Sequence, residues 1–167
     1  MQPLKAHGFY SRTLVDVEFD GPIRVRRYLC CCCKRTVSLL PDFALPYLRF
    51  GITVIALFLV ACLLLGRTLN AAAMAAKQPG MPYQRGQFWV RRFQQQAERL
   101  SGALAALIAP PSAPNFISRA LQMLQSIGWI AAHRFLFADL RVHLLGWPPF
   151  LAPSGRIATL RPAAPPA

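Results

Sequence analysis

Four consecutive cysteines, Cys30 to Cys33, are the residues whose type and spacing most directly suggest chemistry. Two thiolates separated by two residues on a tight turn can point at one tetrahedral Zn²⁺. Cys30 and Cys33 have this spacing, and a closed structural site needs two further ligands. His7 could supply a third ligand, and Cys31 or Cys32 a fourth. We therefore take Cys30 and Cys33 as candidate zinc ligands, and a knuckle without metal is the alternative.

The cysteine count also bears on the cellular compartment. The fifth cysteine, Cys62, makes the number odd, which is a poor basis for a disulfide framework. Adjacent cysteines cannot bridge each other without backbone strain, so we expect a reducing compartment. Residues Met1 to Arg12 contain no apolar stretch of the kind found in secretory signals. Together these features predict a cytoplasmic protein.

Basic side chains are the second feature with chemical meaning. The 167 residues include 19 Lys and Arg but only 6 Asp and Glu, which gives a net charge of +13. This balance favours a polyanionic partner, either nucleic acid or a membrane surface. Hydrophobic residues make up 54% of the chain, which excludes a simple disordered basic tail. A nuclease of the three-carboxylate type needs separated acids around Mg²⁺, and so few acids predict that the protein is not an enzyme.

The N-terminal segment must position the cysteines and much of this charge. Residues 13–19 and 23–29 are rich in strand-forming residues, and Asp20-Gly21 between them is a hairpin-turn signal. A third strand is expected over 36–40, before Pro41. Such a hairpin could clamp a phosphate backbone, and a merely solvated basic face is the alternative. The candidate DNA-binding residues of this region are Arg24, Arg26, Arg27, Lys34 and Arg35.

Residues 47–108 predict helices. Thr68 is the expected N-cap of a short helix, and a Pro- and Gly-containing break at 78–82 precedes a long helix over 84–107. Apolar residues recur in the long helix at spacings of three and four and predict one buried face: Trp89, Phe93, Ala97, Leu100, Leu104 and Leu107. The pair resembles a helix-turn-helix, whose second helix enters the major groove. Its candidate DNA-binding residues are Arg85, Gln87, Arg91, Arg92 and Gln95, and an ordinary amphipathic helix with solvated arginines is the alternative.

One apolar segment allows two interpretations. Residues 50–66 are 17 residues without a charge, and as a helix they would measure about 25 Å against a hydrocarbon core of about 30 Å. They would form either a buried core helix or the span of a small single-pass membrane protein. In the second case the cysteine cluster becomes a candidate for S-acylation. Basic residues flank both ends, so the positive-inside rule indicates no orientation.

The expected organisation is a mainly α fold with a small N-terminal part. That part, residues 1–46, is predicted to be a β-hairpin of zinc-ribbon type, and a helical, helix-turn-helix-like region follows over 47–108. Residues 109–114 contain the sequence PPSAP and predict a linker. Helices are expected over 115–153, with Asn115 as an N-cap. The Pro- and Ala-rich residues 154–167 predict a disordered tail.

The stretch from His7 to Phe50 contains the pattern R-R-Y-x-C-x-x-C-x-R-T-x-S-x-L-P between Arg26 and Pro41. It resembles the N-terminal region of an uncharacterised, transposase-like family of bacterial mobile elements, in which a zinc ribbon precedes a helix-turn-helix. The likeness continues through residues 82–93 and 128–153. In that family a first CxxC precedes the position of His7, where this chain has only six residues. The sequence therefore predicts either a start further upstream or a decayed ribbon.

The resemblance implies a non-catalytic, DNA-binding protein of a transposon or insertion element in the bacterial cytoplasm. Such a protein would act with a transposase or associate with itself. The resemblance also makes residues 50–66 the first helix of the DNA-binding part, rather than a membrane span. A degraded fragment of a mobile element, without function, is a third interpretation.

Overall fold

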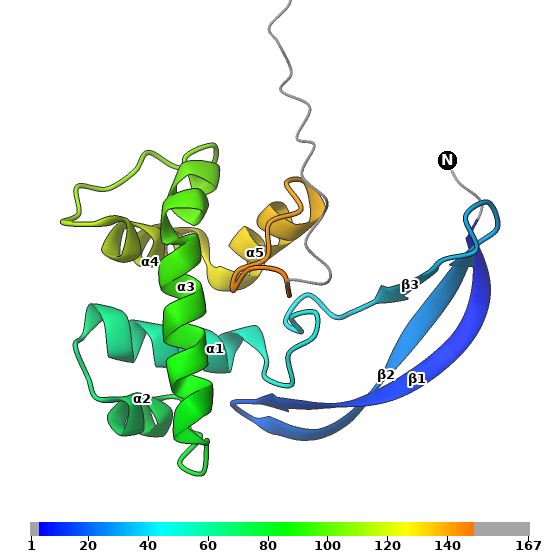
Figure 1. Ribbon diagram of the computed structural model, residues 1–167, viewed down its shortest axis with the longest axis horizontal. Coiled ribbons are helices and arrows are strands. Elements are labelled where there is room, and N and C mark those ends of the chain that lie inside the picture. The colour runs from blue at the N-terminus through cyan, green and yellow to red at the C-terminus, as the bar shows by residue number, and fades with distance from the viewer. Residues whose placement is uncertain (1–3, 149–167) are drawn as a thin grey trace, which may run out of the picture.

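The structure, a computed structural model, describes residues 4–148, and the strands come from their N-terminal part. β1 (Leu4–Asp16) and β2 (Phe19–Cys30) form a long antiparallel hairpin, and β3 (Thr36–Leu39) pairs with the other side of β2. We call β1, β2, β3 and the loop at residues 31–35 the hairpin arm. Figure 1 shows it beside the helices, with the loop end pointing away from them.

The hairpin turn lies at residues 17–18, so the predicted turn at Asp20-Gly21 is wrong. Asp16 pairs with Phe19, and Gly21 lies inside β2 opposite Leu14. The Asp16 side chain accepts a hydrogen bond from the Val17 amide at 2.9 Å, which stabilises the turn at residues 17–18. Burial of strand residues sets this register, because a shift by one residue would turn every side chain to the opposite face.

The turn end of the hairpin arm is anchored to the rest of the chain. Leu14 and Val15 are buried. The Val15 amide donates to the Arg49 carbonyl at 2.9 Å, and the Gly51 amide donates to the Val15 carbonyl at 2.7 Å. These two bonds tie the hairpin to the segment that leads into the first helix.

Within the described residues, five α-helices form the helical body. α1 (Ile52–Leu59) continues into a π-helical turn, Val60–Leu64. α2 (Leu69–Ala75), α3 (Tyr83–Leu104), α4 (Phe116–Ile127) and α5 (Trp129–Ala138) follow, and α3 crosses in front of α1. The predicted caps are confirmed. The Thr68 hydroxyl accepts from the Ala71 amide at 3.2 Å, and the Asn115 side chain accepts from the Ser118 amide at 2.8 Å.

The core lies where α3 crosses α1. Trp89 of α3 is fully buried and meets Phe50 and Phe58 edge-on, with ring centroids 5.1 and 5.3 Å apart. A Cβ atom at Gly86 would lie 2.7 Å from the Phe58 ring, so the helices approach closely there. The predicted buried face of the long helix is confirmed except at Leu107, which lies beyond the end of α3 and is 43% exposed.

Residues 50–66 contribute a short core helix rather than one continuous span. Val54, Ile55, Phe58 and Leu59 are fully buried in the helical body. The α-helix ends after Leu59, and the π-helical turn ends at Leu64. Among residues 4–148, no helix combines the length and the apolar character needed to cross a bilayer.

The prediction of a mainly α fold is wrong. The described chain is 44% helical and 22% strand, which makes it a mixed α and β structure. The expected hairpin exists, but it is much longer than predicted, because β1 also includes residues 4–12, which show no clear apolar alternation. The cross-strand hydrogen bonds with β2 extend the strand there without a buried apolar face.

The helix-turn-helix-like and zinc-ribbon-like parts of the predicted fold are corrected as well. α2 has only seven residues, and the connection from Ala76 to Pro82 is longer than the turn of that motif. α3 buries one face along its whole length and serves as the central packing helix. The β part is a three-stranded sheet rather than a small ribbon. Residues 105–115, which include the predicted linker at 109–114, lie between α3 and α4, and the predicted tail at 154–167 lies outside the described residues.

Candidate functional site

The outer face of the hairpin arm carries arginines stacked on an aromatic ring. Arg26 pairs with Phe9 and Arg24 pairs with Ser11 across the strands, so all four side chains share one face. The guanidinium carbon of Arg24 lies 4.7 Å from the centroid of the Phe9 ring, and that of Arg26 lies 4.6 Å from it. Arg26 also approaches the Tyr28 ring at 5.7 Å. One exposed ring therefore orders two cations.

This stacking leaves hydrogen-bond donors for a ligand. A guanidinium over an aromatic face is held by its charge and keeps its N–H groups at the edge. The Nε atom of Arg26 has no hydrogen-bond partner within residues 4–148, but it is closed to solvent and is not itself a donor that a ligand can reach. Phe9 itself is 50% exposed. The outer face thus presents ordered positive charge on a surface that also offers apolar contact.

The inner face of the hairpin arm turns toward the helical body. Arg27 lies on this face, where its guanidinium donates to the Thr36 hydroxyl at 2.9 Å and lies 5.9 Å from the Tyr10 ring. Arg12, also on this face, donates to the Leu48 carbonyl. The five predicted arm residues are therefore divided: Arg24 and Arg26 lie on the outer face, Arg27 on the inner face, and Lys34 and Arg35 in the end loop.

Charge is separated along the hairpin arm. Asp16, Glu18 and Asp20 lie at or beside the turn, next to the helical body. The remaining stretches, residues 4–12 and 22–39, contain no Asp or Glu. They carry seven cations: Lys5, Arg12, Arg24, Arg26, Arg27, Lys34 and Arg35.

The four cysteines lie at the far end of the arm, Cys30 as the last residue of β2 and Cys31 to Cys33 in the loop. Cys30 is only 3% exposed, whereas Cys31, Cys32 and Cys33 are exposed. The loop is closed by the Lys34 amide, which donates to the Cys30 carbonyl at 3.0 Å. Hydrogen bonds within the loop lower the pKa of the Cys30 thiol. The largest contribution comes from the Cys33 backbone, followed by the Cys33 thiol and the Cys32 backbone.

The structure does not complete the predicted zinc site. Within residues 4–148, no three His, Cys, Asp or Glu side chains are grouped as metal ligands would be. His7, the suggested third ligand, lies at the irregularity in the pairing between Ala6 and Gly8. Zinc binding by Cys30 and Cys33 stays a prediction from the sequence.

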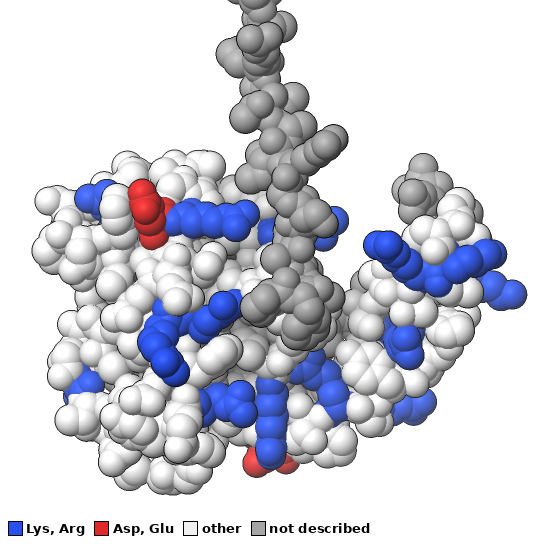
Figure 2. Space-filling model, in the orientation of Figure 1, with Lys and Arg blue, Asp and Glu red and all other residues white. Residues whose placement is uncertain are grey.

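The predicted residues of α3 do not form a single surface. Arg85 and Gln87 are two residues apart and therefore point about 200° apart around the helix. Arg92 donates from Nε to the Leu145 carbonyl at 2.8 Å and from Nη2 to the Trp147 carbonyl at 2.7 Å, so it holds the chain after α5. Arg91 and Gln95 are exposed. Figure 2 shows basic side chains over α3 and along the hairpin arm on the same face of the molecule.

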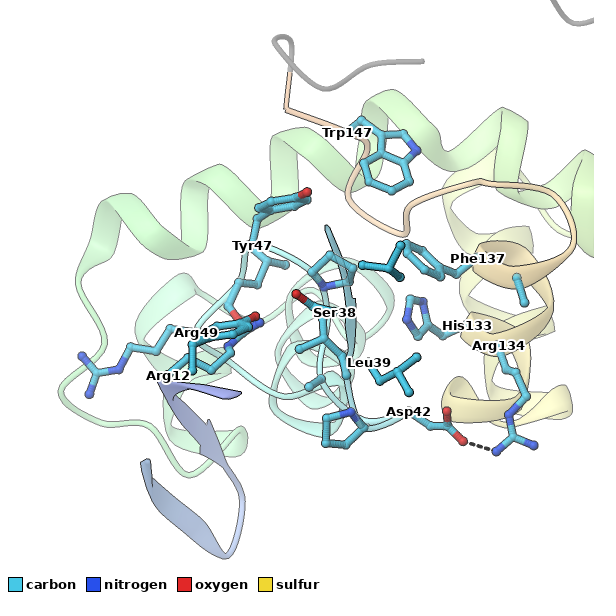
Figure 3. A pocket seen from close by; sticks show the side chains of 18 of the residues that line it. Arg12, Ser38, Leu39, Asp42, Tyr47, Arg49, His133, Arg134, Phe137 and Trp147 are labelled. Carbon is cyan, nitrogen blue, oxygen red and sulfur yellow. Dashed lines mark hydrogen bonds and ion pairs between the residues drawn. The ribbon is translucent and has the colours of Figure 1, made fainter. Parts of the chain in front are cut away.

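A cleft between the hairpin arm and α5 was not predicted from the sequence. It has a volume of about 820 Å³, and we call it the arm–body cleft. In Figure 3, Arg12, Arg49 and Tyr47 lie on one side of it, and His133, Phe137 and Trp147 lie on the other. Asp42, a carboxylate of its lining, is paired with Arg134. The lining joins segments more than a hundred residues apart, such as those of Arg12 and His133, which no local pattern reveals.

Two histidines near the cleft differ in role. His143 is structural, because it accepts from the Leu145 amide at Nδ1 over 3.1 Å and its Nε2 meets the Pro46 carbonyl at 3.2 Å. His133 lines the cleft and is 6% exposed, and its Nδ1 has no hydrogen-bond partner in the described chain. Burial first, and then the charge of His143, lower the pKa of His133 to about 4, although Asp42 opposes the shift. His133 is therefore neutral at pH 7.

Backbone strain gathers at the same cleft. Tyr47 has φ +63° and Arg141 has φ +54°, in the left-handed region that bulky residues rarely adopt. The Arg141 carbonyl accepts from the Trp147 indole at 2.9 Å, which helps to place that ring. Tyr47 nevertheless remains 62% exposed. Strained residues of this kind cluster at functional sites, and a mainly exposed ring is not held there by core packing.

Comparison with known protein families gives a match in the N-terminal part of the chain. Residues 1–75 match a family described as a domain of unknown function (DUF6431), which is less than half of the chain. The match covers the hairpin arm, α1 and α2, and nothing in it links the chain to transposases or zinc ribbons. No curated protein and no solved structure matches the chain.

Proposed function

We propose that this protein binds DNA without catalysing a reaction on it, and that the hairpin arm is its main DNA-binding element. The observation that carries the proposal is the ordered pair of arginines, Arg24 and Arg26, stacked on Phe9 in an acid-free stretch of the arm. Cations held in a fixed geometry favour contact with phosphates, and each contact releases condensed counterions.

The shape of the hairpin arm supports the same partner. A two-stranded β-ribbon can enter the major groove of B-DNA, which is about 12 Å wide. The arm projects beside the helical body (Figure 1), and basic side chains lie along it (Figure 2). This mode replaces the helix-in-groove mode expected from the sequence. Because the N-terminal sequence resembles a transposase-like family, the DNA of a mobile element is the proposed target.

DNA binding measured against salt concentration tests the proposal. We expect the affinity to fall steeply with salt, with a slope of about −0.9 per phosphate contact. The double variant Arg24→Gln and Arg26→Gln should lose about tenfold or more in affinity. Its salt dependence should be less steep, by the amount that about two phosphate contacts contribute to the slope. A flat salt dependence of the unmodified protein would overturn the proposal.

A matched control separates a specific arm from general positive charge. The double variant Arg67→Gln and Arg99→Gln removes the same charge from exposed positions of the helical body. We expect it to keep most of the affinity. Equal losses in the two double variants would show that the arm has no special role.

A further inference from the structure

The arm–body cleft has the properties of a ligand site rather than of a packing defect. Its volume of about 820 Å³ lies within the range of small-molecule pockets. Aromatic rings and a few polar groups converge in its lining, as they do in such pockets. A cleft of this size accepts a ligand of nucleotide dimensions, but not a length of duplex.

The charges of the lining select an anion. Arg12, Arg49 and Arg141 all border the cleft. The carboxylate of the lining, Asp42, is neutralised by its ion pair with Arg134. Arg49 is largely exposed and lies 3.9 Å from Asp20, a distance at which the pair contributes little. The cleft therefore keeps a net positive charge beside its aromatic wall.

The aromatic side chains offer a stacking surface. The Tyr47 ring is exposed and meets Trp147 edge-on, with the ring centroids 6.5 Å apart. Bases of single-stranded nucleic acids stack on exposed rings of this kind, while nearby cations hold the backbone. Tyr47 has a positive φ, and the segment around it is held by buried Leu45 and by the hydrogen bond between His143 and the Pro46 carbonyl, so the exposed ring is fixed at the edge of the cleft.

His133 adds a hydrogen-bonding group. It is a buried imidazole in the lining whose Nδ1 has no partner among the described residues. A buried polar atom without a partner is costly, and because this atom is closed to solvent, a ligand group would satisfy it only after the imidazole turned toward the cleft. Nucleobase edges carry both donors and acceptors, so a neutral imidazole can pair with either.

We infer that the arm–body cleft holds one unpaired nucleotide of a DNA strand, with its base stacked on Tyr47 and its phosphate near Arg12 and Arg49. This inference rests on the proposed DNA binding by the hairpin arm and specifies the form of DNA. β1 contributes Tyr10 and Arg12 to the cleft and carries Phe9 on the outer face, so the cleft borders the same strand as the arginines proposed to contact the duplex. The preferred ligand is a duplex with a single-stranded end.

The test compares two fluorescent DNAs that share one duplex sequence, one with blunt ends and one with a short single-stranded overhang. We expect the full-length protein to bind the overhang DNA about tenfold more tightly, as stacking of one base predicts. Tyr47→Asn should abolish this preference and leave the affinity for blunt duplex unchanged. Asn tolerates a positive φ, so this variant should fold at least as well as the parent. Tyr47→Phe keeps the ring and should keep the preference.

The outcomes separate the two proposals. Equal affinity for both DNAs overturns the cleft inference and leaves DNA binding by the arm intact. Binding of neither DNA overturns both. A third measurement uses a free nucleoside monophosphate as the probe. If it binds in a Tyr47-dependent manner while the overhang brings no advantage, the ligand is a free nucleotide, and the inference of a DNA strand is overturned.

Discussion

The hairpin arm and the helical body use opposite means of holding their shape. In the helical body, Trp89, Phe58 and Phe93 are completely buried, and side-chain packing stabilises the helices. In the hairpin arm, most side chains of the first nine described residues are exposed. The arm is held by backbone pairing, by its anchored end at Val15 and by arginines stacked on Phe9.

Because of this difference, we expect the helical body to determine the stability of the protein and the hairpin arm to determine its affinity for DNA. A two-stranded hairpin alone is marginally stable in water, so the arm depends on the helical body for its anchor, whereas the body does not depend on the tip of the arm. The side chains that stabilise the arm by stacking are the same ones proposed to contact DNA. Substitutions in the body should therefore lower global stability, and substitutions in the arm should lower affinity with little effect on stability.

The largest expected effect is a loss of the central ring of the helical body. Trp89→Ala removes the contacts with Phe50 and Phe58 and leaves a cavity, which should lower the free energy of unfolding by about 3–5 kcal/mol. Urea denaturation followed by circular dichroism measures the loss. Trp129→Ala is the control, because Trp129 is only partly buried and should cost less. Similar costs for the two variants would contradict the central role of Trp89.

Acidification should weaken the helical body through His133. Burial lowers its pKa in the folded chain to about 4, below the ordinary histidine value of 6.5 that applies to the unfolded chain, so the unfolded chain binds more protons between these values. The stabilisation is complete above pH 6.5 and is lost as the pH falls toward 4. We expect the free energy of unfolding to be about 1–2 kcal/mol lower at pH 5 than at pH 7. His143, whose pKa burial also lowers, acts in the same direction.

Urea denaturation at several pH values checks this expectation. His133→Gln should reduce the dependence on pH, and His7→Gln, at an exposed position of the arm, is the control. If His133→Gln and the parent lose the same stability on acidification, protonation of His133 is not the cause.

The crossing of α1 and α3 offers a finer comparison within one helix. Gly86→Ala places a Cβ 2.7 Å from the buried Phe58 ring, and the overpacking should exceed the gain in helix propensity and cost about 1 kcal/mol. Gly102→Ala in the same helix meets nothing within 4 Å, so it should stabilise the protein by about 0.5–1 kcal/mol. Thermal unfolding of the two variants should shift in opposite directions, and shifts of the same sign would refute the close approach.

The smallest effect on stability is expected in the hairpin arm. Phe9→Ala removes the ring beneath Arg24 and Arg26, which should cost about 0.5–1 kcal/mol at this exposed site. The same variant should weaken DNA binding, because the two guanidinium groups lose their fixed orientation. For the stability measurement, Val37→Ala on β3, the opposite edge strand of the sheet, is the control for loss of exposed apolar surface. If Phe9→Ala lowered the free energy of unfolding as much as Trp89→Ala does, the proposed difference between the hairpin arm and the helical body would be wrong.

Local signals in the sequence predicted local structure well. The caps at Thr68 and Asn115 were predicted from residue type, and their side chains accept the expected amide hydrogen bonds. The buried face of α3 follows from spacings of three and four residues, because one side of a helix must face the core. The third strand begins at Thr36, as expected.

Signals that depend on pairing were misleading. Asp20-Gly21 is a good turn sequence, yet burial of Leu14 and Val15 at the anchored end places the turn at residues 17–18. The first nine described residues lack an apolar alternation, so their strand was missed, and the fold was predicted as mainly α. The helix-turn-helix interpretation failed because α3 is needed for packing along its whole length.

The sequence by itself determined the chemistry of this protein: strong positive charge, few acids, a cluster of four thiols and one uncharged apolar segment of 17 residues. These properties depend on residue type and short spacing alone. Only the tertiary structure decided which arginines share the outer face with Phe9, and that Arg92 holds the segment after α5 rather than facing solvent. It alone brought Tyr47 and Arg49 opposite His133 and Trp147. The physical reason is that pairing and packing join residues far apart along the chain, and their geometry depends on the whole core.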